Sequence, residues 1–148
     1  MNLIEVAHKY AGNNFNLQMT IAKEILHYDI LSILYQNPIG KFLVFQGGTA
    51  LRLCHQNNRY SEDLDFVVDN GTKFELSDMT FFREAFERKI KNKYGLDIEL
   101  DEPKNNENLV KKYTAKILLP LTNRQKAKIN IEIAQIPSYD NSLQTIIN

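Results

Sequence analysis

Cysteine and histidine are scarce in this sequence of 148 residues. The single cysteine, Cys54, cannot form an internal disulfide, and His8, His27 and His55 do not form a Cys/His cluster at zinc spacing. Cys54 and His55 are adjacent, so on a helix their side chains point about 100° apart and cannot act together as nucleophile and base. These absences exclude disulfide, zinc and cysteine–histidine chemistry.

Long apolar runs and an excess of charge are also missing. The longest apolar run, residues 117–121, is far too short to cross a bilayer, and Glu5, His8 and Lys9 interrupt the N-terminal region where a signal peptide needs unbroken apolar residues. We therefore expect a cytoplasmic protein with no membrane partner. The 18 Lys and Arg residues balance the 18 Asp and Glu residues, so any nucleic acid must be bound locally.

The remaining composition, 43% hydrophobic and 24% charged, is typical of one globular domain. Apolar residues at helical spacing predict helices over residues 20–35, with Thr20 as N-cap, and over about 49–56 and 77–94. Short apolar or alternating runs predict five strands, over residues 42–45, 63–68, 96–101, 112–119 and 126–134. This order predicts an α/β or α+β fold, with helices packed on a mixed sheet.

A glycine pair, Gly47 and Gly48, joins the first predicted strand to the helix that begins at Thr49. Glycine lets the backbone approach a ligand closely, and a helix N-terminus offers free N–H groups and the positive end of its dipole to a phosphate. A tight turn without a ligand is the alternative interpretation.

Two carboxylates, Asp63 and Asp65, lie two positions apart in the second predicted strand and therefore share one face, while Leu64 and Phe66 face the core. Two neighbouring negative charges repel each other, so a shared divalent cation explains the pair better than a metal-free structural role. A two-metal phosphoryl-transfer site usually has a third carboxylate, and Glu132 offers one on the polar face of the last predicted strand. If the two strands are neighbours, Glu132 comes within cross-strand reach of the pair.

Other charged and polar residues are candidates for the same site. Asp97, Glu99 and Asp101 also alternate along a strand, but no glycine-rich loop precedes them, so we expect them to solvate an outer face or protect a sheet edge. Arg59 and Ser61 precede the carboxylate strand and could reach a bound phosphate; an ion pair with a neighbouring acid is the alternative for Arg59.

The segment between positions 104 and 128 contains seven basic residues and only one acidic residue, Glu107. They could hold a triphosphate or an RNA backbone, or they could simply belong to a solvated hairpin. The seven are Lys104, Lys111, Lys112, Lys116, Arg124, Lys126 and Lys128.

The glycine pair, the Asp63-Leu64-Asp65 motif and the strand with Glu132 together resemble the DNA polymerase β-like nucleotidyltransferases. Residues 47–53 and 59–66 look more narrowly like the AbiEii/AbiGii family, the toxins of type IV toxin-antitoxin and abortive-infection systems. The resemblance runs from about Thr20 to Ala134, and its specific part is 46–66.

The resemblance implies a nucleotidyltransferase fold in which Gly47, Gly48 and Thr49, with Arg59 and Ser61, bind the nucleotide. Asp63, Asp65 and Glu132 would bind Mg²⁺, with a two-ion site expected, and would carry catalysis. The implied substrates are an NTP and an RNA (tRNA) or protein acceptor, and a cognate antitoxin is an implied partner.

Relatives generally continue into a helical second domain with further active-site residues, whereas this chain stops at Asn148. We therefore expect a single nucleotidyltransferase domain over residues 1–148 without the helical C-terminal domain. Two alternatives remain: a non-catalytic module that binds an NTP or a partner, as a truncated fragment would, and a metal-dependent nuclease, which leaves the glycine pair unexplained.

Overall fold

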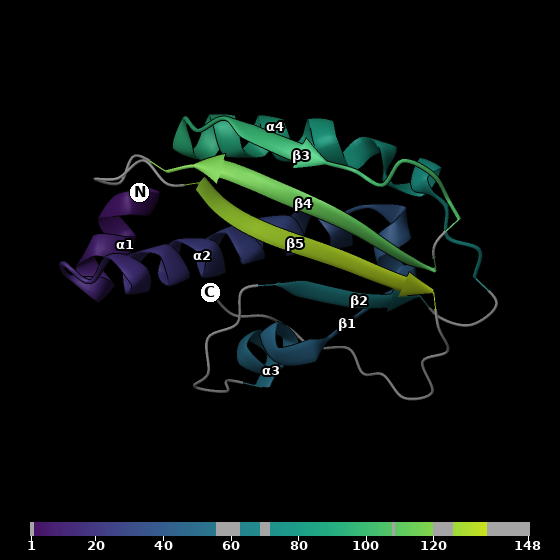
Figure 1. Ribbon diagram of the computed structural model, residues 1–148, viewed down its shortest axis with the longest axis horizontal. Coiled ribbons are helices and arrows are strands. Elements are labelled where there is room, and N and C mark those ends of the chain that lie inside the picture. The colour runs from purple at the N-terminus through teal and green to yellow at the C-terminus, as the bar shows by residue number, and fades with distance from the viewer. Residues whose placement is uncertain (1, 56–62, 69–71, 108, 120–125, 136–148) are drawn as a thin grey trace.

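A computed structural model of the chain describes residues 2–55, 63–68, 72–107, 109–119 and 126–135 (Figure 1). The helices are α1 (Leu3–Ala11), α2 (Phe15–Tyr35), α3 (Gly47–His55) and α4 (Thr80–Tyr94), with 3-10 turns η1 (Pro38–Phe42) and η2 (Leu76–Met79). The strands are β1 (Leu43–Gln46), β2 (Leu64–Val68), β3 (Ile98–Asp101), β4 (Val110–Leu118) and β5 (Lys126–Gln135).

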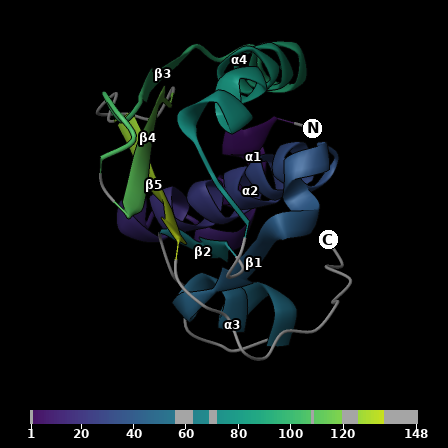
Figure 2. The same cartoon turned by 90° about the vertical axis from the view of Figure 1, so that its right-hand side faces the viewer.

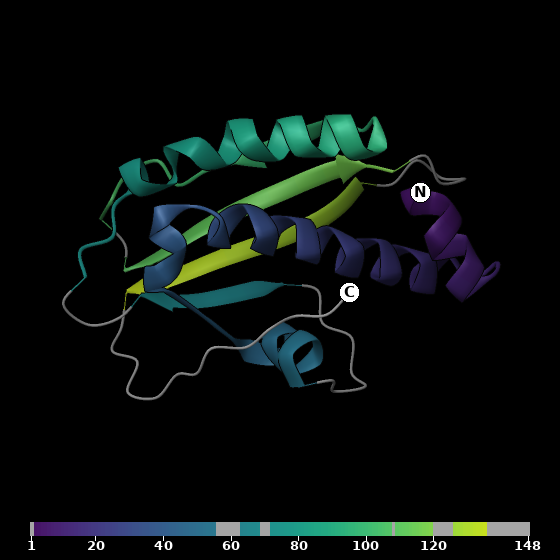
Figure 3. The same ribbon diagram turned by 180° about the vertical axis from the view of Figure 1, so that it is seen from behind.

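The five strands form one sheet in the order β1-β2-β5-β4-β3. β2 and β5 are parallel, and the other three neighbouring pairs are antiparallel. The long helices α2 and α4 lie on one face of this sheet, whereas α3 packs beside β1 and β2 (Figures 2 and 3). The predicted mixed sheet with packed helices is confirmed. We call the face of the sheet away from α2 and α4 the open face.

The core lies between the sheet and the two long helices. β5 alternates along its length, so Ile129, Ile131 and Ile133 are buried on the helix side while the intervening side chains lie on the open face. Leu26 of α2 and Phe86 of α4 are fully buried in the same cluster. Burying each such side chain stabilises the fold by about 1.5–3 kcal/mol.

The N-terminal part of the fold differs from the sequence prediction. The helix expected to begin at Thr20 begins at Phe15, because the side chain of Asn14 caps it by accepting a hydrogen bond from the N–H of Leu17. The Thr20 hydroxyl instead donates to the carbonyl of Asn16 inside the helix. Helix α1 was not predicted. No helix in the described part of the chain is long and apolar enough to cross a membrane.

A buried carboxylate joins the two helices that cover the sheet. Asp29 of α2 is 2% exposed and accepts hydrogen bonds from the Lys93 ammonium, at 2.8 Å, and the Tyr94 hydroxyl, both near the end of α4. Burial, the hydrogen bond to Asp29 and the charge of Asp29 together raise the pKa of Tyr94. The Lys93 ammonium, with that of Lys89 at 3.9 Å, compensates the charge of Asp29, and the Tyr94 hydroxyl supplies a hydrogen bond that water cannot.

Replacing this carboxylate tests its contribution to helix packing. We expect Asp29→Ala to lower the free energy of unfolding by about 2 kcal/mol, since the Tyr94 hydroxyl loses its acceptor. Asp97, which pairs with Lys91 at 3.0 Å on the surface, provides the matched control. Asp97→Ala is expected to cost less than about 0.5 kcal/mol. Equal losses for the two variants in urea denaturation would contradict a special role for the buried pair.

Candidate nucleotide and metal site

The pairing of β2 with β5 brings the predicted carboxylates together. The parallel register sets Asp65 beside Glu132, and the backbone N–H of Asn130 donates to a carboxylate oxygen of Asp63 at 3.3 Å. The adjacency that the sequence left open is therefore present. The roles of these side chains stay predictions.

The electrostatics of Asp65 reflect this crowding. Burial makes the largest contribution to raising its pKa, followed by the negative charges of Glu132 and Asp63 and a side-chain hydrogen bond with Glu132. Asp65 and Glu132 are half-buried and Asp63 is exposed, so the group remains open to solvent. Among the described residues, no cationic side chain forms an ion pair with these three acids.

The start of α3 lies against the same carboxylates. Gly47 has a φ of +85°, and a Cβ atom there would stand 2.7 Å from an Asp65 carboxylate oxygen. Only glycine combines this backbone conformation with such a close approach. The glycine pair thus places the N-terminus of a nine-residue helix directly beside the acids, and Gly48 is exposed there.

Thr49, which the resemblance assigns to nucleotide binding, has a structural contact. It is 1% exposed, and its hydroxyl donates to the backbone carbonyl of Asp63. This bond ties the first turn of α3 to the residue that precedes β2. Arg59 and Ser61, the other two predicted nucleotide-binding residues, lie outside the described residues.

The carboxylates fit a magnesium ion by their chemistry, because Mg²⁺ prefers oxygen ligands and no described cation pairs with Asp63, Asp65 or Glu132. Within the described ranges, however, no three His, Cys, Asp or Glu side chains converge as a ready-formed metal centre. Asp63, Asp65 and Glu132 are therefore neighbours that do not yet form a metal centre in the described part of the chain.

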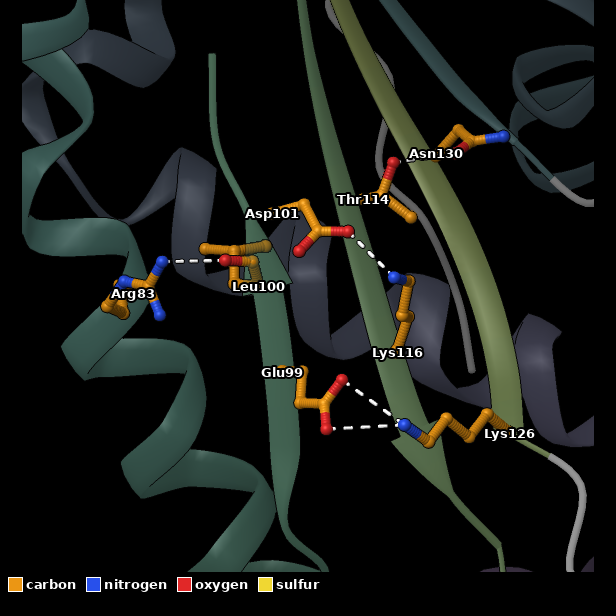
Figure 4. Close-up of polar contacts among 8 residues, drawn as sticks. All are labelled: Arg83, Glu99, Leu100, Asp101, Thr114, Lys116, Lys126 and Asn130. Carbon is orange, nitrogen blue, oxygen red and sulfur yellow. Dashed lines mark hydrogen bonds and ion pairs between the residues drawn. The ribbon is translucent and has the colours of Figure 1, made fainter. Parts of the chain in front are cut away.

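The alternating acids near β3 have a different role. Asp97 pairs with Lys91, Glu99 with Lys126 at 3.2 Å, and Asp101 with Lys116 at 2.8 Å. Figure 4 shows the last two pairs, which join β3 to β4 and β5 across the open face. These acids are exposed and compensated by lysines, which agrees with the expectation that they solvate an outer surface.

Sequence reasoning missed Gln46 as a neighbour of the carboxylates, and it did not place Lys112, one of the seven basic residues, beside them. Across the open face, partner residues on β1, β2, β5 and β4 form one line, Gln46, Asp65, Glu132 and Lys112, which we call the central row. Alternation could have placed Gln46 and Lys112 on the correct face. Only the strand order places them in the same row.

A separate hollow of about 610 Å³ lies between α2 and α4, away from the carboxylates. Lys89 and Lys93, which line it, both pair with the buried Asp29. Because their charges have a structural use, we assign no ligand to this hollow.

Comparisons with known proteins identify the family and the fold. Residues 29–147 match a family model described as the nucleotidyl transferase AbiEii toxin of a type IV toxin-antitoxin system. The structure is similar to that of JHP933 from Helicobacter pylori, with a TM-score of 0.54 and 24% identity over 81% of this chain and 46% of that one. A structure described as a proposed nucleotidyltransferase from H. pylori gives a TM-score of 0.47 and 24% identity over 75% of this chain and 44% of that one. No curated protein matches. The chain spans about half the length of the two structures.

The close approach of Gly47 to Asp65 can be tested with a second glycine of positive φ. Gly95, at φ +68°, has no atom within 4 Å of its would-be Cβ. We expect Gly47→Ala and Gly95→Ala each to lose about 1 kcal/mol of stability from backbone strain. Only Gly47→Ala should also weaken Mg²⁺ binding, measured by calorimetry, because its methyl group displaces the Asp65 carboxylate. Unchanged Mg²⁺ binding in Gly47→Ala would show that a side chain at position 47 does not disturb the Asp65 carboxylate.

The raised pKa of Asp65 predicts how the stability of the metal-free protein changes with pH, when a chelator is present. The folded chain keeps this proton to higher pH than the unfolded chain, so the free energy of unfolding falls as pH rises through the raised pKa. We expect Asp65→Asn to remove this fall and to stabilise the metal-free protein by about 0.2–1 kcal/mol at pH 7.

Asp101 provides a control of opposite sign, because the hydrogen bond and charge of Lys116 lower its pKa. Its ionised form stabilises the fold at pH values above the ordinary pKa of an Asp side chain. This stabilisation is lost as the pH falls through the lowered pKa. Asp101→Asn should therefore destabilise the protein at pH 7. Thermal unfolding between pH 3 and pH 8 checks the predictions for Asp65→Asn and Asp101→Asn. If stability depends on pH in the same way in wild type and in Asp65→Asn, the raised pKa is not that of Asp65.

Proposed function

Because the chain belongs to the AbiEii family of nucleotidyltransferase toxins from type IV toxin-antitoxin systems, we propose that it transfers a nucleotide from an NTP to an acceptor with the help of Mg²⁺. The observation that carries this proposal is the meeting of Asp65, Glu132 and the N-terminus of α3 at one place on the open face. A helix N-terminus suits a phosphate, and the paired carboxylates suit the cation that accompanies it.

In this proposal Gly47 and Gly48 contact the triphosphate through the backbone N–H groups at the start of α3. Asp63, Asp65 and Glu132 supply the ligand oxygens for Mg²⁺. A bound ion would neutralise charge on the triphosphate and would make the attacking hydroxyl easier to deprotonate. The acceptor hydroxyl would lose its proton to a nearby carboxylate such as Glu132 as its oxygen forms the new bond to the α-phosphorus. Pyrophosphate would leave on the opposite side with the electron pair of the broken P–O bond.

Arg59 and Ser61 complete the nucleotide site in this proposal, through contacts with the phosphates. The acceptor is an RNA such as tRNA, or a protein, and a cognate antitoxin is the partner. We propose the cytoplasm as the place of action, where NTPs and these acceptors are present.

A second candidate function is a module that binds an NTP or a partner without turnover. The observation in its favour is that the three carboxylates do not converge as a ready-formed metal centre in the described part of the chain. Transfer of label from an α-labelled NTP to any acceptor excludes this candidate.

Titration of each NTP in Mg²⁺ by calorimetry tests the nucleotide site. We expect binding by the wild-type chain and at least a tenfold loss in Asp63→Ala and in Asp65→Ala, because each variant removes a ligand of the cation. Asp101→Ala is the matched control, since Asp101 is also an acid on the open face but pairs with Lys116. It should keep wild-type affinity. An NTP affinity that does not depend on Mg²⁺ or on either carboxylate would contradict the proposal.

A further inference from the structure

The central row has two chemically different ends. At the β1 end, Gln46 leads directly into Gly47 and the positive end of the α3 dipole, which is formed by backbone groups. At the β4 end stands Lys112, the antiparallel partner of Glu132. Neighbouring strands lie about 4.8 Å apart, so Lys112 is one strand from Glu132 and two strands from Asp65. The carboxylates therefore lie between two positive groups.

Lys112 differs from other lysines on the same face. Lys116 and Lys126 are held by Asp101 and Glu99 (Figure 4), and Lys128 stands in the field of Asp101. Lys112 is exposed and makes no ion pair or side-chain hydrogen bond with the described residues, although Glu132 is its register partner. As far as the described ranges show, the ammonium of Lys112, the lysine of the central row, is thus available for a ligand.

The geometry of the reaction indicates what this ammonium contacts. In an in-line displacement the leaving and attacking oxygens occupy opposite sides of the phosphorus. If the leaving pyrophosphate is bound at the start of α3, the attacking hydroxyl approaches from the side of β5 and β4. An acceptor entering there meets Lys112 beside Glu132.

We propose that Lys112 is an acceptor-binding residue that contacts a backbone phosphate of an RNA acceptor near its attacking hydroxyl. This inference rests on the proposed function. A free ammonium next to a carboxylate group favours a polyanionic acceptor, because its positive charge offsets the repulsion between phosphates and the acids. The open face of β4 and β5 is thereby assigned as the acceptor side of the site.

The experiment measures binding of a single-stranded RNA 20-mer to the full 148-residue chain by fluorescence anisotropy between 50 and 200 mM salt. We expect Lys112→Gln to weaken binding about five- to tenfold at 50 mM salt. The slope of log affinity against log salt should become shallower by about 0.7, the value for one lost phosphate contact on a single strand. A purely structural role for Lys112 would not change this slope.

Lys126→Gln is the matched control, because it removes the same charge from the same face at a lysine that Glu99 already holds. It should stay within twofold of wild type. NTP titration in Mg²⁺ should give the same affinity for Lys112→Gln and wild type, which separates the acceptor side from the nucleotide side.

Several results would overturn the inference while leaving the proposed function intact. These are an equal effect of the two substitutions, no RNA binding by a wild-type chain that binds NTP, and a weaker NTP affinity in Lys112→Gln. Labelling of a protein acceptor that RNA does not compete away would likewise overturn it. If the wild-type chain binds no NTP, both the proposed function and the inference fail.

Discussion

The parallel pairing of β2 with β5 is the contact on which the site depends, because it joins residues from distant parts of the sequence. Parallel strands need a long connection, and here that connection contains α4, β3 and β4. Once Leu64 is set beside Ile131, the two-residue period of both strands requires Asp65 to stand beside Glu132 on the opposite face. A shift of one residue would bury the acids and expose the core.

The apolar face of the same strands supplies the stability that the acidic face lacks. Leu64, Phe66, Ile131 and Ile133 are almost completely buried under the helices, so the register is held by the core. Crowded carboxylates oppose folding only modestly, because they remain partly open to water. The fold therefore holds negative charges together without an ion-pair partner in the described part of the chain.

Side chains from the two long helices bind backbone carbonyls of the two edge strands of the sheet. Tyr35 of α2 donates to the carbonyl of Leu43 on β1, and Arg83 of α4 donates to the carbonyl of Leu100 on β3 at 2.6 Å. Both strands are edges of the sheet, where unpaired backbone groups would otherwise be free to pair with another chain. The long helices thus protect the edges, and on the open face the only described helix is α3, which packs beside β1 and β2.

Sequence patterns predicted the strands and their polar faces because alternation is a local property. The strand with Asp65 and the strand with Glu132 were placed correctly to within about two residues. Their adjacency could not be predicted, since strand order is set by how all the helices pack. The start of α2 was misjudged because Asn14 competes with Thr20 as a cap and the apolar stripe is weak at that end.

In the proposed function, the central row explains why the two sides of the candidate site would be built from different groups. On the β1 side, charge is supplied by backbone N–H groups whose positions are fixed by Gly47 and by the bond from Thr49 to the carbonyl of Asp63. Fixed donors suit a ligand of constant shape, such as a triphosphate. On the β4 side, charge is supplied by a long, flexible side chain, which can follow a phosphate whose position varies between acceptors. The difference in rigidity between α3 and Lys112 therefore matches the difference between a constant substrate and a variable one.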